Sequence, residues 1–144
     1  MARATVYLRW PTRSALIGAA ARAAVGGQPL PLSGDLDADI RFASSFIRGV
    51  FEVPSFTAIL PEIIRGVLAG ELAFDSVAPR RRPLAAAYRE GADVQGFDAS
   101  RDPNLAFDIL LGTALVRLLA TRRAMSSDQA SELADVVIRG LRTP

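Results

Sequence analysis

The chain has 144 residues, of which 50% are hydrophobic and 22% are charged, and it contains neither cysteine nor histidine. This length suits one domain of ordinary size. The lack of Cys excludes disulfides and thiolate nucleophiles, and the lack of His removes the commonest general base and metal ligand. The serine pairs at 44–45 and 126–127 have no His or Lys to activate them. We therefore expect no enzyme activity, no cofactor and no metal.

No stretch of the sequence approaches the roughly 20 apolar residues of a membrane-spanning helix, so we expect a soluble, cytoplasmic protein. All seventeen basic residues are Arg. Together with the many alanines, this points to a GC-rich bacterial coding sequence.

Positive charge is concentrated at the amino end. Residues 1–34 contain four Arg and no acid, whereas residues 35–144 contain thirteen Arg and fifteen acids. A basic segment of this kind is a candidate footprint for nucleic acid, because Arg neutralises phosphates and releases counterions. An organellar transit peptide and a solvated helix face are the alternatives.

The apolar residues recur at helical spacing throughout, which predicts an all-α fold. A first helix is expected over residues 2–10 and ends at Pro11. A second helix, capped by Thr12 or Ser14, runs to the glycines at 26–27. Residues 28–34 form a loop, and the next helix extends to residue 53. The acids at 35, 37 and 39 suit the first turn of that helix better than a cation site.

Further helices are expected over residues 55–70, 71–77 and 84–94. Pro61 kinks the first of these or marks its true first turn. The three adjacent arginines at 80–82 are interpreted as a solvated helix start, because consecutive helical residues point about 100° apart and cannot form one basic stripe.

The last two helices have the clearest boundaries and form a helical hairpin. Asp102 is the expected cap of a helix that begins at Pro103 and contains residues 105–120. That helix is apolar nearly all round and must be covered on more than one side. Ser126 and Gln129 form a capping box for the final helix, which extends to residue 142.

The run T-V-Y-L-R-W-P-T-R-S-A-L-I at residues 5–17 resembles the end of the DNA-binding domain of TetR-type (tetracycline-repressor-like) transcriptional regulators. In that family the second helix of a helix-turn-helix carries Thr-x-Tyr, an aromatic residue and a short turn, and a basic residue opens the next helix. The resemblance implies that Thr5, Tyr7 and Arg13 contact phosphates and that Trp10 belongs to the core. It places Arg3 and Ala4 near the start of the recognition helix, where bases are read.

The two carboxyl-terminal helices also resemble those of the family, in which they pair with a second subunit as a four-helix bundle. The resemblance therefore implies a homodimer, with the interface residues Leu110, Ala114, Arg117, Leu118, Leu133, Val137 and Leu141. The middle helices of the family enclose an effector pocket. Here the aromatic candidates for lining a pocket for a small hydrophobic effector are Phe42, Phe46, Phe56, Tyr88 and Phe107.

These expectations divide the chain into a remnant of the DNA-binding domain at residues 1–27 and a ligand-binding and dimerisation domain at residues 28–144. About two helices that precede this point in the family are missing, so we expect a start assigned late or a fragment. The full-length form is expected to be a ligand-responsive repressor that binds palindromic operator DNA as a dimer and releases it on binding the effector. The alternative is a DNA-free module that sequesters an effector or a partner subunit.

Overall fold

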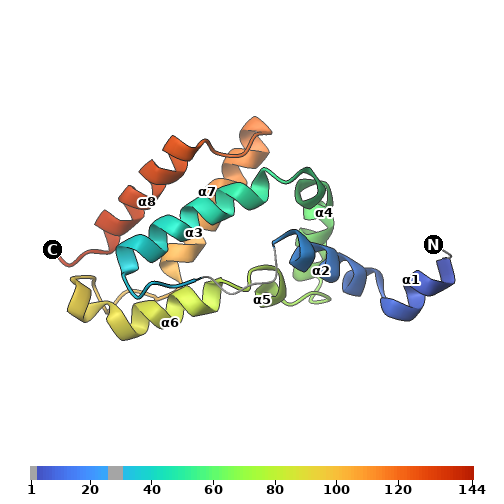
Figure 1. Cartoon of the computed structure of the whole chain (residues 1–144), viewed down its shortest axis with the longest axis horizontal. Helices are drawn as coiled ribbons and strands as arrows, with labels where there is room; N and C mark the ends of the chain where they lie inside the picture. The colour runs from blue at the N-terminus through green and yellow to red at the C-terminus, as the bar shows by residue number, and fades with distance from the viewer. Residues whose placement is uncertain (1–2, 26–30) are drawn as a thin grey trace. The chain divides into compact units, whose positions relative to one another are not determined.

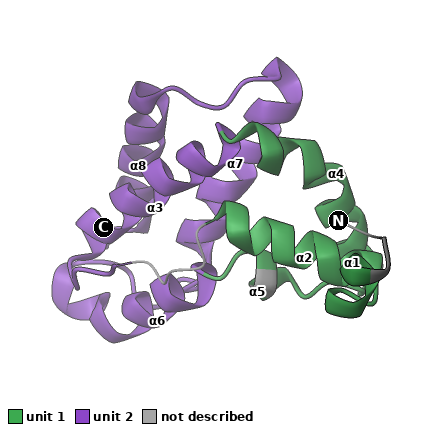
Figure 2. Ribbon diagram, turned by 45° about the vertical axis from the view of Figure 1, so that its right-hand side comes forward, with its two compact units in different colours: residues 1–28, 53–79 green, residues 29–52, 80–144 purple. Residues whose placement is uncertain are grey.

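The computed structural model describes residues 3–25 and 31–144. All regular structure within these ranges is helical, which confirms the all-α expectation. The chain forms two compact units, each built from two separate segments (Figure 2). Unit 1 comprises residues 1–28 and 53–79, and unit 2 comprises residues 29–52 and 80–144.

Unit 1 is organised around the packing of α2 on α4 and α5. Its helices are α1 (Arg3–Arg9), α2 (Arg13–Ala24), α4 (Pro54–Leu68) and α5 (Phe74–Val77). The expected cap of α2 is confirmed, because the Thr12 hydroxyl accepts a hydrogen bond from the Ala15 amide at 3.0 Å. Pro61 lies inside a continuous α4 and does not mark its start.

A close contact at Leu72 fixes the packing of α2. A Cβ at Gly18 of α2 would lie 2.9 Å from Cδ1 of Leu72, and one at Gly66 of α4 would lie 3.3 Å from its Cβ. The Leu72 amide also donates to the Gly66 carbonyl at 3.0 Å. The two glycines therefore admit the Leu72 side chain, which is 9% exposed, against both helices.

Unit 2 is built around α3, which packs against α6, α7 and α8 (Figure 1). Its elements are α3 (Leu36–Phe51), α6 (Arg81–Gly91), the 3-10 turn η1 (Asp93–Gln95), α7 (Leu105–Thr121) and α8 (Ser127–Leu141). Ile40, Leu110 and Ala134 are fully buried between these helices. The buried Ser44 hydroxyl donates to the Ala130 carbonyl at 2.7 Å and so ties α3 to α8.

Caps fix the start of α3 and α8. The Asp35 carboxylate accepts from the Ala38 amide at 3.2 Å. The buried carboxylate of Asp39 accepts from the amide and the hydroxyl of Ser33 at 2.7 and 2.8 Å. These bonds confirm that Asp35 and Asp39 serve the start of α3. The capping box of Ser126 with Gln129 is also present.

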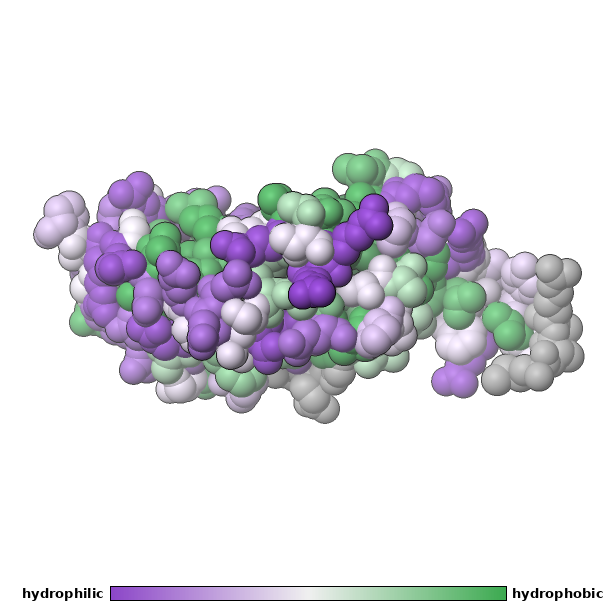
Figure 3. All heavy atoms as spheres, turned by 90° about the horizontal axis from the view of Figure 1, so that it is seen from above, coloured by the Kyte–Doolittle hydropathy of each residue, from purple (hydrophilic) through white to green (hydrophobic). Residues whose placement is uncertain are grey.

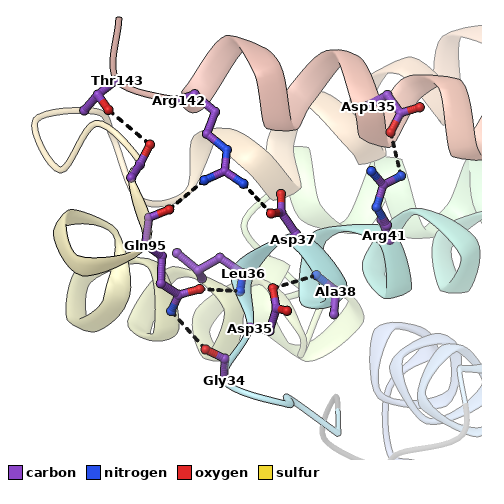
Figure 4. Close-up of polar contacts among 11 residues, drawn as sticks. Gly34, Asp35, Leu36, Asp37, Ala38, Arg41, Gln95, Asp135, Arg142 and Thr143 are labelled. Atoms are coloured by element: carbon purple, nitrogen blue, oxygen red, sulfur yellow. Dashed lines mark hydrogen bonds and ion pairs between the residues drawn. The ribbon is translucent and has the colours of Figure 1, made fainter.

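The carboxyl-terminal residues are clasped to the first turn of α3 and to η1 (Figure 4). The Arg142 guanidinium donates to the Gln95 carbonyl at 2.6 Å, pairs with the Asp37 carboxylate, and lies 4.4 Å from the centroid of the Phe97 ring. The Gln95 side chain in turn accepts from the Leu36 amide at 2.9 Å. This clasp joins three segments of unit 2 that are far apart in the sequence.

Three helix starts differ from the expectation. α5 begins at Phe74 rather than at residue 71. The helix after Pro103 begins two residues later than a cap at Asp102 predicts, with Asn104 as its N-cap. Asp102 instead accepts from the Asn104 amide and side chain at 2.9 and 3.0 Å, which closes a turn before the helix. α6 begins at Arg81 rather than at residue 84, so Pro83 lies within its first turn, where the missing amide hydrogen costs nothing.

The arginines at the start of α6 are not simply solvated. Arg80 is 5% exposed, and its guanidinium lies 3.6 Å from the centroid of the Phe46 ring. Arg81 makes a two-fold hydrogen-bonded ion pair with Asp108 of α7, at 2.6 and 2.7 Å. The solvated interpretation is therefore wrong for these two residues, because their planar guanidinium groups meet an aromatic face and a carboxylate.

The two compact units do not have the boundaries that the sequence predicted for the two domains, residues 1–27 and 28–144. Residues 53–79 pack with the amino-terminal helices, whereas the sequence grouped them with residues 28–144. The apolar side of α4 supplies the reason, since its Phe56, Leu60 and Ile63 are buried. The functional division itself stays a prediction. Within the described part of the chain, no helix combines the length and the apolar character needed to cross a membrane.

Candidate functional site

The expected DNA-contacting residues lie on α1 and at the start of α2. Thr5 is exposed and Tyr7 is 61% exposed, so both present hydroxyl groups to solvent. Arg3 and Ala4 lie in the first turn of α1, and their side chains fall outside the described part. Trp10 is half-buried, in keeping with a packing role.

Arg13 opens α2, as expected, but it already has a partner in unit 1. Its guanidinium lies 2.7 Å from the Glu62 carboxylate of α4, with 69% of the Arg13 side chain exposed. A phosphate at this position would have to compete with the carboxylate.

Sequence reasoning missed an open groove of about 450 Å³ beside the start of α2. Arg9 and Arg22 lie on its rim with Trp10, and neither arginine forms an ion pair among the residues that the structure describes. The Arg9 guanidinium lies 5.1 Å from the centroid of the Trp10 ring. The remaining lining residues are Thr12, Ser14, Ala15, Gly18, Glu71, Leu72 and Ala73. Two arginines and an aromatic ring suit a phosphate or another anionic group.

Glu71 is the acidic residue of this groove, and neighbouring donors stabilise its charge. The Ser14 hydroxyl donates to its carboxylate at 2.8 Å and Arg65 donates at 3.2 Å. These two hydrogen bonds hold the pKa of Glu71 below its ordinary value. The groove therefore carries two arginine charges beside a carboxylate that Arg65 already balances.

The aromatic residues expected in an effector pocket lie in several places. Phe42 and Phe46 stack on α3 with ring centroids 6.5 Å apart, and Phe42 is 43% exposed. Phe107 is buried at the start of α7. Tyr88 is buried in α6, where its hydroxyl donates to the Asp98 carbonyl at 2.9 Å.

Burial and neighbouring charge affect two side chains near these aromatics. Burial raises the pKa of Tyr88 above its ordinary value, and the nearby Asp98 carboxylate acts in the same direction. Burial lowers the pKa of Arg80, which lies on the Phe46 ring. Phe56 belongs to unit 1 and the other four aromatic candidates belong to unit 2.

Four of the expected interface residues lie inside unit 2. Leu110 and Ala114 of α7 and Val137 and Leu141 of α8 are at most 3% exposed, because these positions face the core. Leu118 and Leu133 are half-buried and Arg117 is exposed.

A different set of residues is available at the surface of α7 and α8. Ile109, Val116 and Leu119 of α7 are 37, 63 and 65% exposed, and Val136 of α8 is 52% exposed. Gly112 is also exposed. Figure 3 shows hydrophobic residues that reach the surface in patches among hydrophilic ones. We call the exposed apolar positions 109, 112, 116, 119 and 136 the outer face of the α7–α8 hairpin.

The groove beside α2 suits the binding of an anionic group, and the outer face of the α7–α8 hairpin suits association with another apolar surface. Among the described residues, no group of three or more acids is placed to hold a metal ion. A comparison of the chain with models of protein families, with curated proteins and with solved structures finds no match.

Proposed function

We propose that this chain belongs to a TetR-type regulator of transcription, a ligand-responsive repressor of the bacterial cytoplasm that acts as a homodimer. The motif at residues 5–17 supports the proposal, as does the all-α fold that ends in a helical hairpin. In this proposal, Thr5, Tyr7 and Arg9 of α1 and the groove beside α2 belong to the surface that approaches DNA phosphates.

The outer face of the α7–α8 hairpin is the observation that carries the proposal. α7 presents large apolar side chains to solvent over three turns, and Asp108, the acid near the start of this face, is already paired with Arg81. The exposed apolar positions of α7 extend about 15 Å along the helix, with Val136 of α8 exposed beside the hairpin. Burial against a second subunit removes this apolar surface from water.

In the proposed mechanism a small hydrophobic molecule changes the balance between two arrangements of the dimer. It binds beside the stacked rings of Phe42 and Phe46 and favours a spacing of the DNA-binding parts that no longer matches successive major grooves. Operator binding is proposed for the dimer, in which each subunit presents a helix-turn-helix to one half-site.

Sedimentation velocity of the chain and of two valine variants tests the dimer. We expect the wild type to sediment as a dimer at micromolar concentration and Val116→Glu to be monomeric, because a charge would be buried in the interface. Val94→Glu is the matched control, since Val94 is 85% exposed in η1 and lies outside the outer face. A wild-type chain that stays monomeric up to 100-fold higher concentration, or a Val116→Glu variant that dimerises as the wild type does, contradicts the proposal.

The second candidate function is a DNA-free module that binds an effector or a partner subunit. The ion pair between Arg13 and Glu62 favours it, because the basic residue expected on phosphate is already neutralised. A gel-shift comparison of this chain with a form extended by a capped amphipathic helix and a turn separates the two functions. Salt-sensitive DNA binding by the extended form supports the regulator, and none by either form supports the module.

A further inference from the structure

Apolar positions of α7 lie at nearly equal spacing on both sides of Gly112. The half-buried Leu105 and the exposed Leu119 lie seven residues before and after it, and the exposed Ile109 and Val116 lie three residues before and four residues after it. These intervals correspond to one and two helical turns, so the five positions follow one face. An identical helix laid antiparallel across Gly112 would meet the same apolar positions.

Nothing inside the subunit requires the glycine. A Cβ at Gly112 would meet no atom within 4 Å, and the residue lies well inside a helix, where glycine is unfavourable. A glycine on an apolar helix face lets another backbone approach closely.

An independent feature of α8 points to the same symmetry. Glu132 and Arg139 are exposed on either side of Val136 and form no ion pair with any described residue, whereas Asp135 pairs with Arg41 of α3 at 2.6 Å. In two antiparallel copies of α8 that cross at Val136, each Glu132 lies within one residue, about 1.5 Å along the helix, of the level of the Arg139 of the other copy. The charges are therefore self-complementary about Val136.

The two crossing points also lie at the same level of the hairpin. Gly112 is nine residues before Thr121, where α7 ends, and Val136 is nine residues after Ser127, where α8 begins. At 1.5 Å per residue, both points are about 13 Å from the connecting turn. One axis perpendicular to both helices can therefore pass through both.

We propose that the outer face binds a second copy of this chain about a two-fold axis that passes Gly112 and Val136, with each helix antiparallel to its own copy and two Glu132–Arg139 pairs at the edge. This inference rests on the proposed homodimer and adds its register. A rotation that places α7 on the copy of α8 is the competing arrangement.

The absence of cysteine from the sequence makes the axis directly measurable. A residue beside a two-fold axis lies near its own copy, so a single cysteine there forms a disulfide between subunits, which needs Cα atoms within about 7 Å. We expect Val136→Cys to cross-link on mild oxidation. Leu119→Cys lies about 10 Å along the helix from the axis and should not cross-link with itself, but should do so when mixed with Leu105→Cys. Val94→Cys is the control for collisions, being 85% exposed and outside the face.

Charge exchange tests the pairs at the edge. We expect Glu132→Arg and Arg139→Glu each to weaken the dimer at least five-fold, and the double exchange to restore wild-type association. Gly112→Ala should raise the melting temperature of the monomer and weaken the dimer about ten-fold, whereas Gly49→Ala, in an equally open position of α3, should leave association unchanged.

The outcomes separate this inference from the proposed function. A chain that never dimerises contradicts both. A dimer that Val116→Glu dissociates, but in which Val136→Cys does not cross-link or Leu119→Cys cross-links with itself, overturns the two-fold axis and leaves the proposed function standing. If the double exchange weakens the dimer by the sum of the two single effects, the Glu132–Arg139 pairs do not form.

Discussion

Replacing Arg142 by Ala should destabilise unit 2 by about 2 kcal/mol. The variant loses a charged hydrogen bond to the Gln95 carbonyl, which contributes about 1.5–3 kcal/mol when well formed. It also loses the stacking on Phe97, about 0.5–1 kcal/mol, and a surface ion pair with Asp37 of at most about 1 kcal/mol. The Arg142 side chain is 39% exposed, so water replaces part of these interactions and the lower part of the combined range applies.

Urea unfolding followed by far-ultraviolet circular dichroism measures this loss. All variants are compared at one protein concentration, because association would add to the apparent stability. Arg142→Lys keeps the charge but not the planar fork, and should lose about half as much as Arg142→Ala. A double-mutant cycle with Asp37→Asn should give a coupling of about 0.5 kcal/mol. A loss below about 0.5 kcal/mol for Arg142→Ala would refute the idea that the clasp stabilises the unit.

Two further predictions concern unit 1. Glu62→Gln should strengthen binding to a random-sequence DNA duplex several-fold at low salt, because it frees Arg13 for phosphate. Glu52→Gln, which removes another paired acid, is the control, and equal anisotropy titrations for both variants would exclude a role for Arg13. Because the pKa of Glu71 is lowered in the folded state, its stabilisation is present above the ordinary pKa of about 4.3 and is lost as the pH falls through the folded value. The difference in unfolding free energy between wild type and Glu71→Gln should therefore be constant from neutral pH to about pH 5 and shrink below about pH 4. A difference that grows on acidification would contradict the sign.

Local signals in the sequence predicted the starts of α2, α3 and α8. The hydroxyl of Thr12 and the pair of Ser126 and Gln129 act on amides three residues away, so their effect needs no knowledge of the fold. Asp102 failed as a cap because its side chain can also close a turn, and the competition between these two uses depends on the chain that follows.

The candidate sites were less predictable, because long-range packing decides which side of a helix is buried. α7 is apolar on all sides, so the sequence showed that it needs more than one neighbour but not which positions meet α3. Leu110 and Ala114 face the core, whereas Val116 and Leu119 face outward. The sequence did not predict the groove beside α2 either, because two of its lining residues, Glu71 and Leu72, lie more than fifty residues after the start of α2.

The interleaved segments of the two units have a consequence for synthesis and for truncation. The chain passes between the units three times, after residues 28, 52 and 79, so neither unit is a continuous stretch that a cut could release whole. On the ribosome, the apolar side of α3 is made early, but Ser44 meets its partner Ala130 only after 86 further residues. During that interval the side of α3 that packs on α8 lacks its partner, and such unpaired apolar surface favours chaperone binding and proteolysis until α8 is made.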